Sequence, residues 1–166
     1  MQIIFSTHNQ GKVKEMRSVL QGLPIEILSA EEASIFEDVE EDGETLTANA
    51  LKKAKFVAEK IGGWAMADDT GFFIDALNGA PGVFASRWLG ENVVEEEKAR
   101  QTIAKISGIR EEDRGGYFET VVALVSPEKE EWVFSGRVKG SDEQKNLLSH
   151  RGEAFRKLKE FLQTYV

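Results

Sequence analysis

Two adjacent carboxylates and a hydroxyl, Asp68, Asp69 and Thr70, follow a short apolar segment of the chain. Oxygen ligands of this kind suit magnesium, which in proteins usually takes one or two carboxylates together with phosphate oxygens and water. A carboxylate here could also accept a proton from an attacking water molecule, and the acidic residues 40–42 could complete such a site. The alternative is a pair of solvated aspartates in a turn, where Asp is common. From this segment alone, both interpretations stay open.

A second candidate site is the hydroxyl-rich loop Ser6-Thr7-His8-Asn9-Gln10-Gly11-Lys12, which precedes an expected helix. Free backbone N–H groups at a helix N-terminus, with a lysine nearby, can bind an anion. The loop is not a Walker A motif, because Ser6 stands where the first glycine would be and Val13 follows the lysine. The alternative is that these residues only cap the helix.

A third candidate is Ser149-His150-Arg151-Gly152, preceded by Lys145. Arginine and histidine are donors that can read acceptors on a base or a phosphate, although such a pair could also be a surface or capping feature. Lys53 lies on an expected helix, where a solvated face is the usual explanation for a lysine. With two histidines and no cysteine in the chain, a histidine-based zinc site and a thiol nucleophile have no support.

The chain has 166 residues, 41% of them hydrophobic, no cysteine and a net charge of −8. This length predicts a single domain with one sizeable core built without disulfides. The negative charge argues against a broad binding surface for DNA or RNA, although local cations or a divalent ion could still hold a small anionic ligand. A signal peptide or membrane span has no support in the apolar pattern. We therefore expect a soluble cytoplasmic protein that binds neither nucleic acid nor membrane.

The spacing of apolar residues predicts the elements that position these side chains. Strands are expected at Met1–Phe5, Ile25–Leu28 and Trp64–Ala67, with Phe72–Asp75 continuing the last of them beyond a turn that holds the two aspartates. Helices are expected at Gly11–Leu23, Leu46–Ile61, Glu91–Ile106 and from Gly152 onward, and a long hairpin at Tyr117–Val125 and Glu131–Val138. This order predicts an α/β or α+β domain around a mixed sheet.

Five segments, in their order along the chain, resemble the motifs of the inosine triphosphate pyrophosphatase family, whose members hydrolyse non-standard purine nucleoside triphosphates. They are Ser6-Thr7-His8-Asn9-Gln10-Gly11-Lys12, Glu40-Glu41-Asp42-Gly43-Glu44-Thr45 with Asn49-Ala50, Ala67-Asp68-Asp69-Thr70-Gly71, Ala76-Leu77-Asn78-Gly79-Ala80-Pro81-Gly82-Val83 and Ser149-His150-Arg151-Gly152-Glu153-Ala154. Because the five motifs are collinear and span most of the chain, the alternatives given above for single segments do not explain the five segments together.

The resemblance implies an α/β fold with an elongated central mixed β-sheet flanked by helices, and two lobes with a substrate cleft between them. It also implies a homodimer, a nucleoside triphosphate substrate and Mg²⁺ as cofactor. The reaction would hydrolyse ITP, dITP or XTP at the α-phosphorus and release a monophosphate and pyrophosphate.

The resemblance further implies a role for each candidate residue. The triphosphate would be held by Thr7, His8, Asn9, Gln10, Gly11 and Lys12, with Lys53 assisting. Glu40 and Asp69 would hold magnesium, and Asp69 would be the proton acceptor, with Asp68 and Lys12 as further catalytic candidates. Thr70, Lys145, His150 and Arg151 would contact the substrate, and the last two would read the 6-oxo edge of the purine.

The sequence departs from the family pattern at one place. Family members carry a glycine-rich stretch with Phe-Gly-Tyr-Asp-Pro, or a close variant, before the Ser-His-Arg motif, and here Gly140 runs straight into Ser141. That stretch supplies an aromatic ring that stacks on the base, and its loss removes about 1–3 kcal/mol of stacking per base. We therefore expect weak base discrimination. A pyrophosphatase with relaxed or pyrimidine specificity and a nucleotide-binding module of low activity remain as alternatives.

Overall fold

The computed structural model describes residues 1–90, 93–139 and 150–166, which form a mixed sheet of six strands in the order β2-β1-β3-β5-β6, with β4 paired to β3. The strands are β1 (Gln2–Phe5), β2 (Glu26–Ser29), β3 (Trp64–Ile74), β4 (Pro81–Gly82), β5 (Gly116–Val125) and β6 (Glu131–Lys139). β1 runs parallel to β2 and β3, whereas β3 with β5, and β5 with β6, are antiparallel pairs. The predicted α/β class, the mixed sheet and the long hairpin are confirmed.

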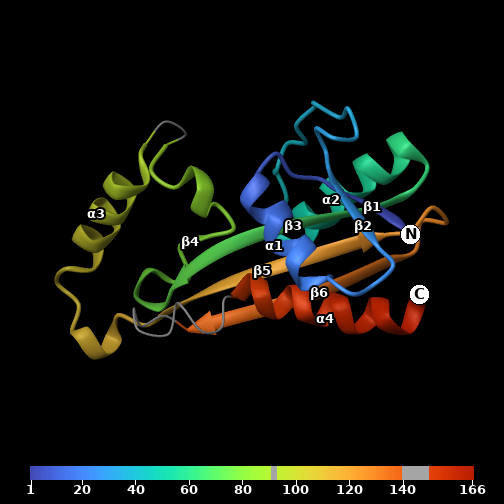
Figure 1. The fold of residues 1–166 in the computed structure, drawn as a ribbon. Coiled ribbons are helices and arrows are strands. Elements are labelled where there is room, and N and C mark those ends of the chain that lie inside the picture. The colour runs from blue at the N-terminus through green and yellow to red at the C-terminus, as the bar shows by residue number, and fades with distance from the viewer. Residues whose placement is uncertain (91–92, 140–149) are drawn as a thin grey trace.

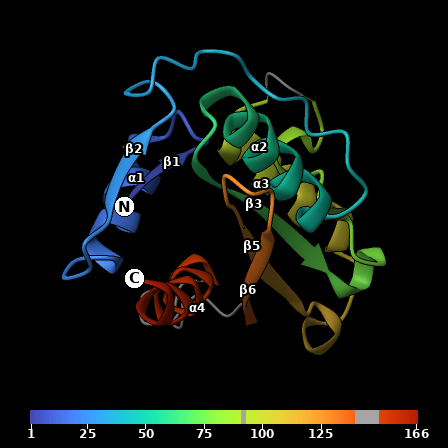
Figure 2. The same ribbon diagram turned by 90° about the vertical axis from the view of Figure 1, so that its right-hand side faces the viewer.

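Helices cover both faces of the sheet because successive residues of a strand point to opposite sides. They are α1 (Gln10–Val19), α2 (Leu46–Ile61), α3 (Glu95–Ile106) and α4 (His150–Tyr165). On one face, Met66 and Leu124 pack with Phe155 of α4 and with side chains of α1. On the other face, Ala65 and Ala67 pack with α2. Figure 2 shows α4 and α2 on opposite sides of the strands.

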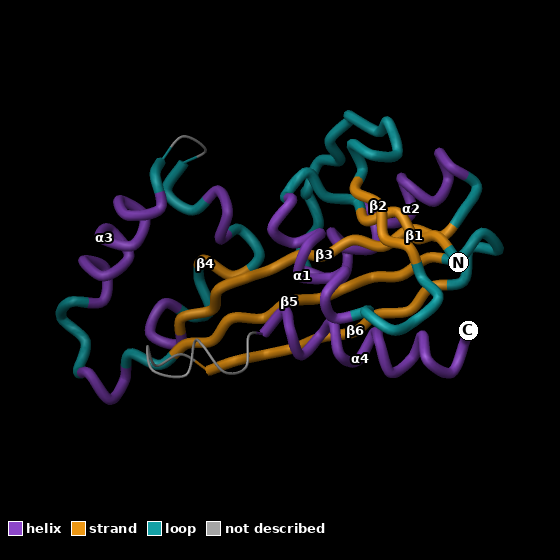
Figure 3. The backbone as a smooth tube through the Cα atoms, viewed as in Figure 1, coloured by secondary structure: helices purple, strands orange, loops and turns teal. Residues whose placement is uncertain are grey.

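The prediction of a turn at the two aspartates is wrong, because β3 continues without interruption from Trp64 to Ile74. Its pairing with β5 runs unbroken from Ala65 opposite Val125 to Ile74 opposite Gly116. The hydrogen bonds of this neighbour keep an otherwise turn-like Asp-Asp-Thr-Gly run extended. β3, β5 and β6 therefore form one long platform that extends beyond the end of β1 (Figure 3).

The far end of this platform carries a second lobe, formed by the chain between β3 and β5. Its described residues form three short 3-10 helices, η1 (Asp75–Leu77), η2 (Ala85–Arg87) and η3 (Glu111–Asp113), together with β4 and α3. Figure 1 shows α3 and β4 at one end of an elongated molecule and α1, α2, β1 and β2 at the other. The predicted elongated shape is confirmed, while a substrate cleft between the lobes stays a prediction.

Three predicted helix boundaries are corrected by the structure. α3 begins at Glu95 and not at Glu91, since residues 93 and 94 are not helical. α1 ends at Val19, with Leu20 as its C-cap, because the chain then turns at Gly22, whose φ is 92°. α4 already begins at His150, two residues before the expected start, so His150 and Arg151 lie on its first turn. Among the helices of the described residues, none has the length and apolarity to cross a membrane.

Candidate active site

Asp68 and Asp69 lie side by side in β3 and point to opposite faces of the sheet. Both side chains are buried, with relative exposures of 1% and 7%. Asp68 faces α1 and α4, where it contacts Lys12 and Arg151, whereas Asp69 faces α2, where it contacts Asn49. The alternative of two solvated turn aspartates is therefore wrong, and the two acids have separate surroundings.

Asp68 lies between two cations from different helices. Lys12 donates a hydrogen bond of 2.9 Å from its Nζ to Asp68 Oδ1, and the Nε of Arg151 lies 3.4 Å from Asp68 Oδ2. Arg151 also places Nη1 3.4 Å from a carboxylate oxygen of Glu15 on α1. The structure thus brings together two predicted substrate-binding residues, Lys12 and Arg151, around one buried carboxylate.

Asp69 is held by the start of α2 and by its own strand. Its Oδ2 accepts a hydrogen bond of 3.0 Å from Nδ2 of Asn49, and its Oδ1 accepts one of 2.9 Å from the backbone N–H of Thr70. Burial raises the pKa of Asp69 above its ordinary value, although the charge of Lys53 and the bond from Asn49 act in the opposite direction. The carboxylate is therefore short of positive charge, a condition that a bound cation would relieve.

Lys53 is not a solvated-face lysine. Its ammonium donates to the carboxylate of Glu41 and, over 2.6 Å, to the backbone carbonyl of Asp68. It is supported in this position by the loop before α2, which is also held by Asn49, whose Oδ1 accepts the backbone N–H of Gly43. The structure therefore places Lys53 beside the acidic pair, and its part in holding the triphosphate stays a prediction.

The predicted partner of Asp69 in a metal site was Glu40, which is exposed and makes no hydrogen bond or ion pair within the described ranges. The carboxylate whose charge reaches Asp69, and contributes to its raised pKa, belongs to the next residue, Glu41. Across the part of the chain that the structure describes, no group of three or more Asp, Glu, His or Cys residues could hold a metal ion. A metal at Asp69 would therefore need oxygen atoms from a bound phosphate as well.

The loop before α1 caps that helix, as the second of the two interpretations of this loop predicted. Asn9 is the N-cap, and its Oδ1 accepts the backbone N–H groups of Gly11 and Lys12, while Thr7 Oγ1 accepts the N–H of Asn9. His8 and Gln10 point elsewhere: His8 lies 3.3 Å from a carboxylate oxygen of Asp38, and Gln10 donates to Glu31. Of this loop, Lys12 is thus the residue in contact with the acidic pair.

The hydroxyl of Thr70 lies on the same face as Asp68, 2.7 Å from the hydroxyl of Thr120 on β5. Two residues farther along β3, on the same face, aromatic rings form a stack of three. Phe72 and Phe118 have ring centroids 4.3 Å apart, and Phe118 and His150 have theirs 5.3 Å apart, with interplanar angles of 16° and 20°. Burial, helped by Arg151, lowers the pKa of His150 below its ordinary value, so its imidazole is neutral at neutral pH.

The first turn of α4 approaches β6 very closely at Gly136. A Cβ atom at this glycine would lie 2.1 Å from the carbonyl oxygen of His150 and 2.7 Å from the backbone nitrogen of Ala154. Only glycine therefore allows the helix to lie where its first residues reach Phe118 and Asp68. Lys145, another predicted substrate-binding residue, lies outside the described residues.

The prediction from sequence missed the residues that hold the others in place: Glu15, Asn49, Phe118, Thr120 and Gly136. Asn49 belongs to one of the recognised motifs and could have been found by asking what it binds. The other four become neighbours of the site only through strand pairing and helix packing, which the sequence does not state.

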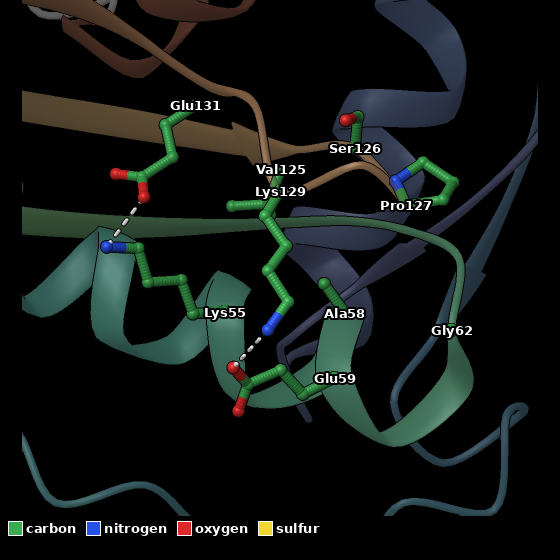
Figure 4. A pocket seen from close by; sticks show the side chains of 9 residues that line it. All are labelled: Lys55, Ala58, Glu59, Gly62, Val125, Ser126, Pro127, Lys129 and Glu131. Carbon is green, nitrogen blue, oxygen red and sulfur yellow. Dashed lines mark ion pairs between the residues drawn. The ribbon is translucent and has the colours of Figure 1, made fainter.

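A cavity of about 550 Å³ lies away from this site, between α2 and the turn that joins β5 to β6. Figure 4 shows that two ion pairs, Lys55 with Glu131 and Lys129 with Glu59, cross it. None of its lining residues belongs to the acidic site, so we assign it no part in the chemistry.

A family profile, curated relatives and solved structures all match most or all of this chain. The sequence profile of the Ham1 family matches residues 3–141. A dITP/XTP pyrophosphatase of Thermoanaerobacter sp. (strain X514) is 36% identical, with 98% of this chain and 96% of that protein covered, and the one of Geobacter sulfurreducens is 35% identical, with 96% of each covered. The solved structure of the Staphylococcus aureus Ham1 protein matches with a TM-score of 0.89 and 28% identity over the full length of both chains.

The alignments also bear on the shortened segment. The alignment with the Thermoanaerobacter protein spans 192 positions, which exceeds the 166 residues of this chain by 26, so at least that many positions have no counterpart here. The profile match ends at residue 141, next to the place where the glycine-rich stretch is expected. That the missing positions lie between Gly140 and Ser141 stays a prediction.

Proposed function

The chain belongs to the Ham1 family, and on this basis we propose that it is a nucleoside triphosphate pyrophosphatase that hydrolyses non-standard purine nucleotides such as dITP and XTP. The products would be a nucleoside monophosphate and pyrophosphate. The curated relatives that cover nearly the whole chain are named dITP/XTP pyrophosphatases, which favours this activity over the pyrimidine-specific and non-enzymatic alternatives.

The observation that carries the proposal is the burial of Asp69 on the side of β3 that faces Asn49 and Lys53, next to an Asp68 that pairs with Lys12 on the other side. A carboxylate with a raised pKa is a better general base than an ordinary aspartate, because its conjugate acid is weaker. We assign to Asp69 the orientation and deprotonation of the attacking water. Lys12 and Lys53 would neutralise charge on the triphosphate, and Thr70 would contact it.

The residues fit a divalent ion, and we propose Mg²⁺. The carboxylate of Asp69 is buried and under-compensated in charge, which suits a cation, and Glu41 and the predicted Glu40 offer hard oxygen ligands on the neighbouring loop. Bound magnesium would neutralise the phosphates and stabilise pyrophosphate as the leaving group. Thr7, Asn9 and Gly11 would add contacts to the phosphate chain at the N-terminus of α1, and His8 and Gln10 would have to leave Asp38 and Glu31 to join them.

We assign recognition of the base to the first turn of α4 and to Lys145. A neutral His150 can both donate and accept a hydrogen bond, and Arg151 only donates, so together they suit the 6-oxo edge of hypoxanthine or xanthine. We further infer a homodimer in the cytoplasm, as the family resemblance implies, and light scattering on the purified protein would measure the dimer directly.

A nucleotide panel tests the proposal. We expect pyrophosphate release from dITP and XTP to be faster than from dATP or dTTP, and to stop when magnesium is withdrawn with a chelator and return when it is restored. Equal rates for dITP and dTTP would contradict the assignment of a purine substrate. Turnover that continues in the presence of the chelator would contradict the requirement for magnesium.

A further inference from the structure

We propose that Asp68 is a positioning residue that holds Lys12 and Arg151 in one ion network, so that the triphosphate end and the base end of the substrate site are set together. This inference deepens the proposed function and rests on it. It also gives Asp68 a different task from its neighbour Asp69.

The strand geometry separates Asp68 from the chemistry. Its side chain leaves β3 on the face covered by α1 and α4, whereas Asp69, to which we assign the proton transfer, leaves on the face covered by α2. Side chains of consecutive strand residues cannot reach the same point without a break in the strand, and β3 is continuous here. Asp68 is therefore unsuited to act as a second base on the water that Asp69 orients.

The contacts of Asp68 show what it does instead. Its carboxylate is 1% exposed, and the side chains of Lys12 and Arg151 on either side are 22% and 26% exposed. One oxygen accepts a hydrogen bond from Lys12. The other, Oδ2, and the Nε of Arg151 are both buried and have no hydrogen-bond partner, although they lie 3.4 Å apart. The buried carboxylate of Asp68 thus lies between two cations, and it accepts a hydrogen bond from only one of them, Lys12.

The network closes through α1. Arg151 reaches Glu15 as well as Asp68, and Glu15 lies three residues after Lys12, on the same face of the helix. α1 and the first turn of α4 are therefore tied at two points, one direct and one through β3. If Lys12 moves toward a phosphate, it neutralises less of the negative charge of Asp68, and the attraction between Asp68 and Arg151 becomes stronger.

This sharing has a measurable consequence. When one cation is removed, the buried carboxylate pairs fully with the cation that remains, because an unpaired buried charge is costly. A change at the phosphate end should then alter base discrimination, and a change at the base end should alter phosphate affinity. Separate subsites would show neither effect.

The first experiment compares Asp68→Asn with Asp69→Asn, the same substitution at the next residue. For Asp68→Asn we expect KM for dITP to rise by at least about fivefold and the ratio of kcat/KM for dITP to that for dATP to change, as is typical of residues in one network. The magnesium concentration for half-maximal rate should stay the same. Asp69→Asn should lose kcat instead.

The second experiment keeps Asp68 and replaces Lys12, which guards against a misfolded Asp68 variant. In Lys12→Met we expect a changed preference between dITP and dATP and a shifted Nε–H resonance of Arg151 in a ¹⁵N spectrum of the free protein. In the Lys12→Met/Arg151→Met double variant, the loss in kcat/KM should be smaller than the product of the two single losses.

The outcomes separate cleanly. Loss of kcat in Asp68→Asn with unchanged KM and base preference would overturn the inference in favour of a catalytic Asp68. An unmoved Arg151 resonance together with multiplicative losses would overturn it in favour of independent subsites. Absence of turnover in the unaltered protein would reject the proposed function alone, since the Arg151 resonance can be measured without turnover.

Discussion

At the scale of single residues, the site depends on side chains that do not touch the substrate. Asn49 is 1% exposed and bridges the backbone N–H of Gly43 to the carboxylate of Asp69. It therefore links the acidic loop before α2 to the residue that we propose as the general base. The orientation of Asp69 is fixed by a neutral amide, which leaves its negative charge available for a cation.

Replacement of Asn49 by Ala tests this bridge. The change leaves a buried carboxylate oxygen and a backbone N–H without their partners, which costs about 1–3 kcal/mol, so we expect a lower free energy of unfolding in urea and a lower kcat. The exposed Gln21→Ala serves as the control and should change neither. If Asn49→Ala unfolds at the same urea concentration as the unaltered protein, the bridge has no energetic role.

His150 and its aromatic neighbours make a second prediction at this scale. Burial lowers the pKa of His150, so the folded protein binds this proton less readily than the unfolded chain does. Protonation of His150 therefore lowers the free energy of unfolding as the pH falls through the ordinary histidine range and below it. At higher pH, His150 is neutral in both states and has no such effect. The charged groups that act on it are Arg151, which lowers its pKa further, and Glu15 and Asp68, which raise it.

An NMR titration measures this shift. We expect His150 to titrate below the ordinary value, and Phe118→Leu, which removes the ring stacked on it, to move its pKa upward by exposing the imidazole to water. His8, the other histidine, gives a second signal that this substitution should leave in place. A His150 curve that does not respond to Phe118→Leu would contradict the role of burial.

At the scale of elements, the long strand β3 and the close contact of α4 with β6 determine which residues meet. The sequence predicted the range of α2, the hairpin strands and the strand that carries the acids, because their apolar periodicity and stop signals are local. It failed at Asp68 to Gly71, where a turn-like composition is held extended by ten paired positions of β5. The start of α4 depends in the same way on a distant residue, Gly136.

Gly136→Ala tests that dependence. The added methyl group would lie within 2.1 Å of the backbone carbonyl of His150, so the first turn of α4 must move away, at a cost of about 1–3 kcal/mol. We expect a lower melting temperature, weaker stacking of His150 and a higher KM for dITP. Gly108→Ala is the matched control, since a Cβ there would meet no atom within 4 Å. Equal behaviour of the two variants would contradict the close-contact account.

At the scale of the whole molecule, the motifs predicted the family and most residues of the acidic site, while the division of the site between two faces of the sheet required the structure. The residues alone grouped Asp68 with Asp69 and left residues 40–42 open as partners, because neighbouring residues look equivalent until a strand and a loop orient them, and the family resemblance then implied Glu40. In the lobe formed by α3, β4 and the short 3-10 helices, the helix α3 was predicted from its own apolar spacing, whereas the lobe as a unit was expected only through the family resemblance.

The shortened stretch after Gly140 leads to a prediction about the molecule as a whole. Because the stacking residue of the family pattern is absent from the sequence, we expect kcat/KM for dITP to be about 5- to 150-fold lower than in the Geobacter sulfurreducens relative, which corresponds to a loss of about 1–3 kcal/mol of stacking. Parallel kinetics on both proteins under the same magnesium concentration measure it. Equal values of kcat/KM would mean that other residues replace the missing platform.

We propose that this protein cleaves a nucleoside triphosphate between its α- and β-phosphates with Asp69 as the base. Chromatography of a dITP reaction with magnesium, run in parallel for the unaltered protein and for Asp69→Asn, tests this reaction. We predict dIMP and pyrophosphate in equal amounts from the unaltered protein and loss of both products in a folded Asp69→Asn variant. Formation of dIDP and orthophosphate, or an undiminished rate in Asp69→Asn, would contradict the claim.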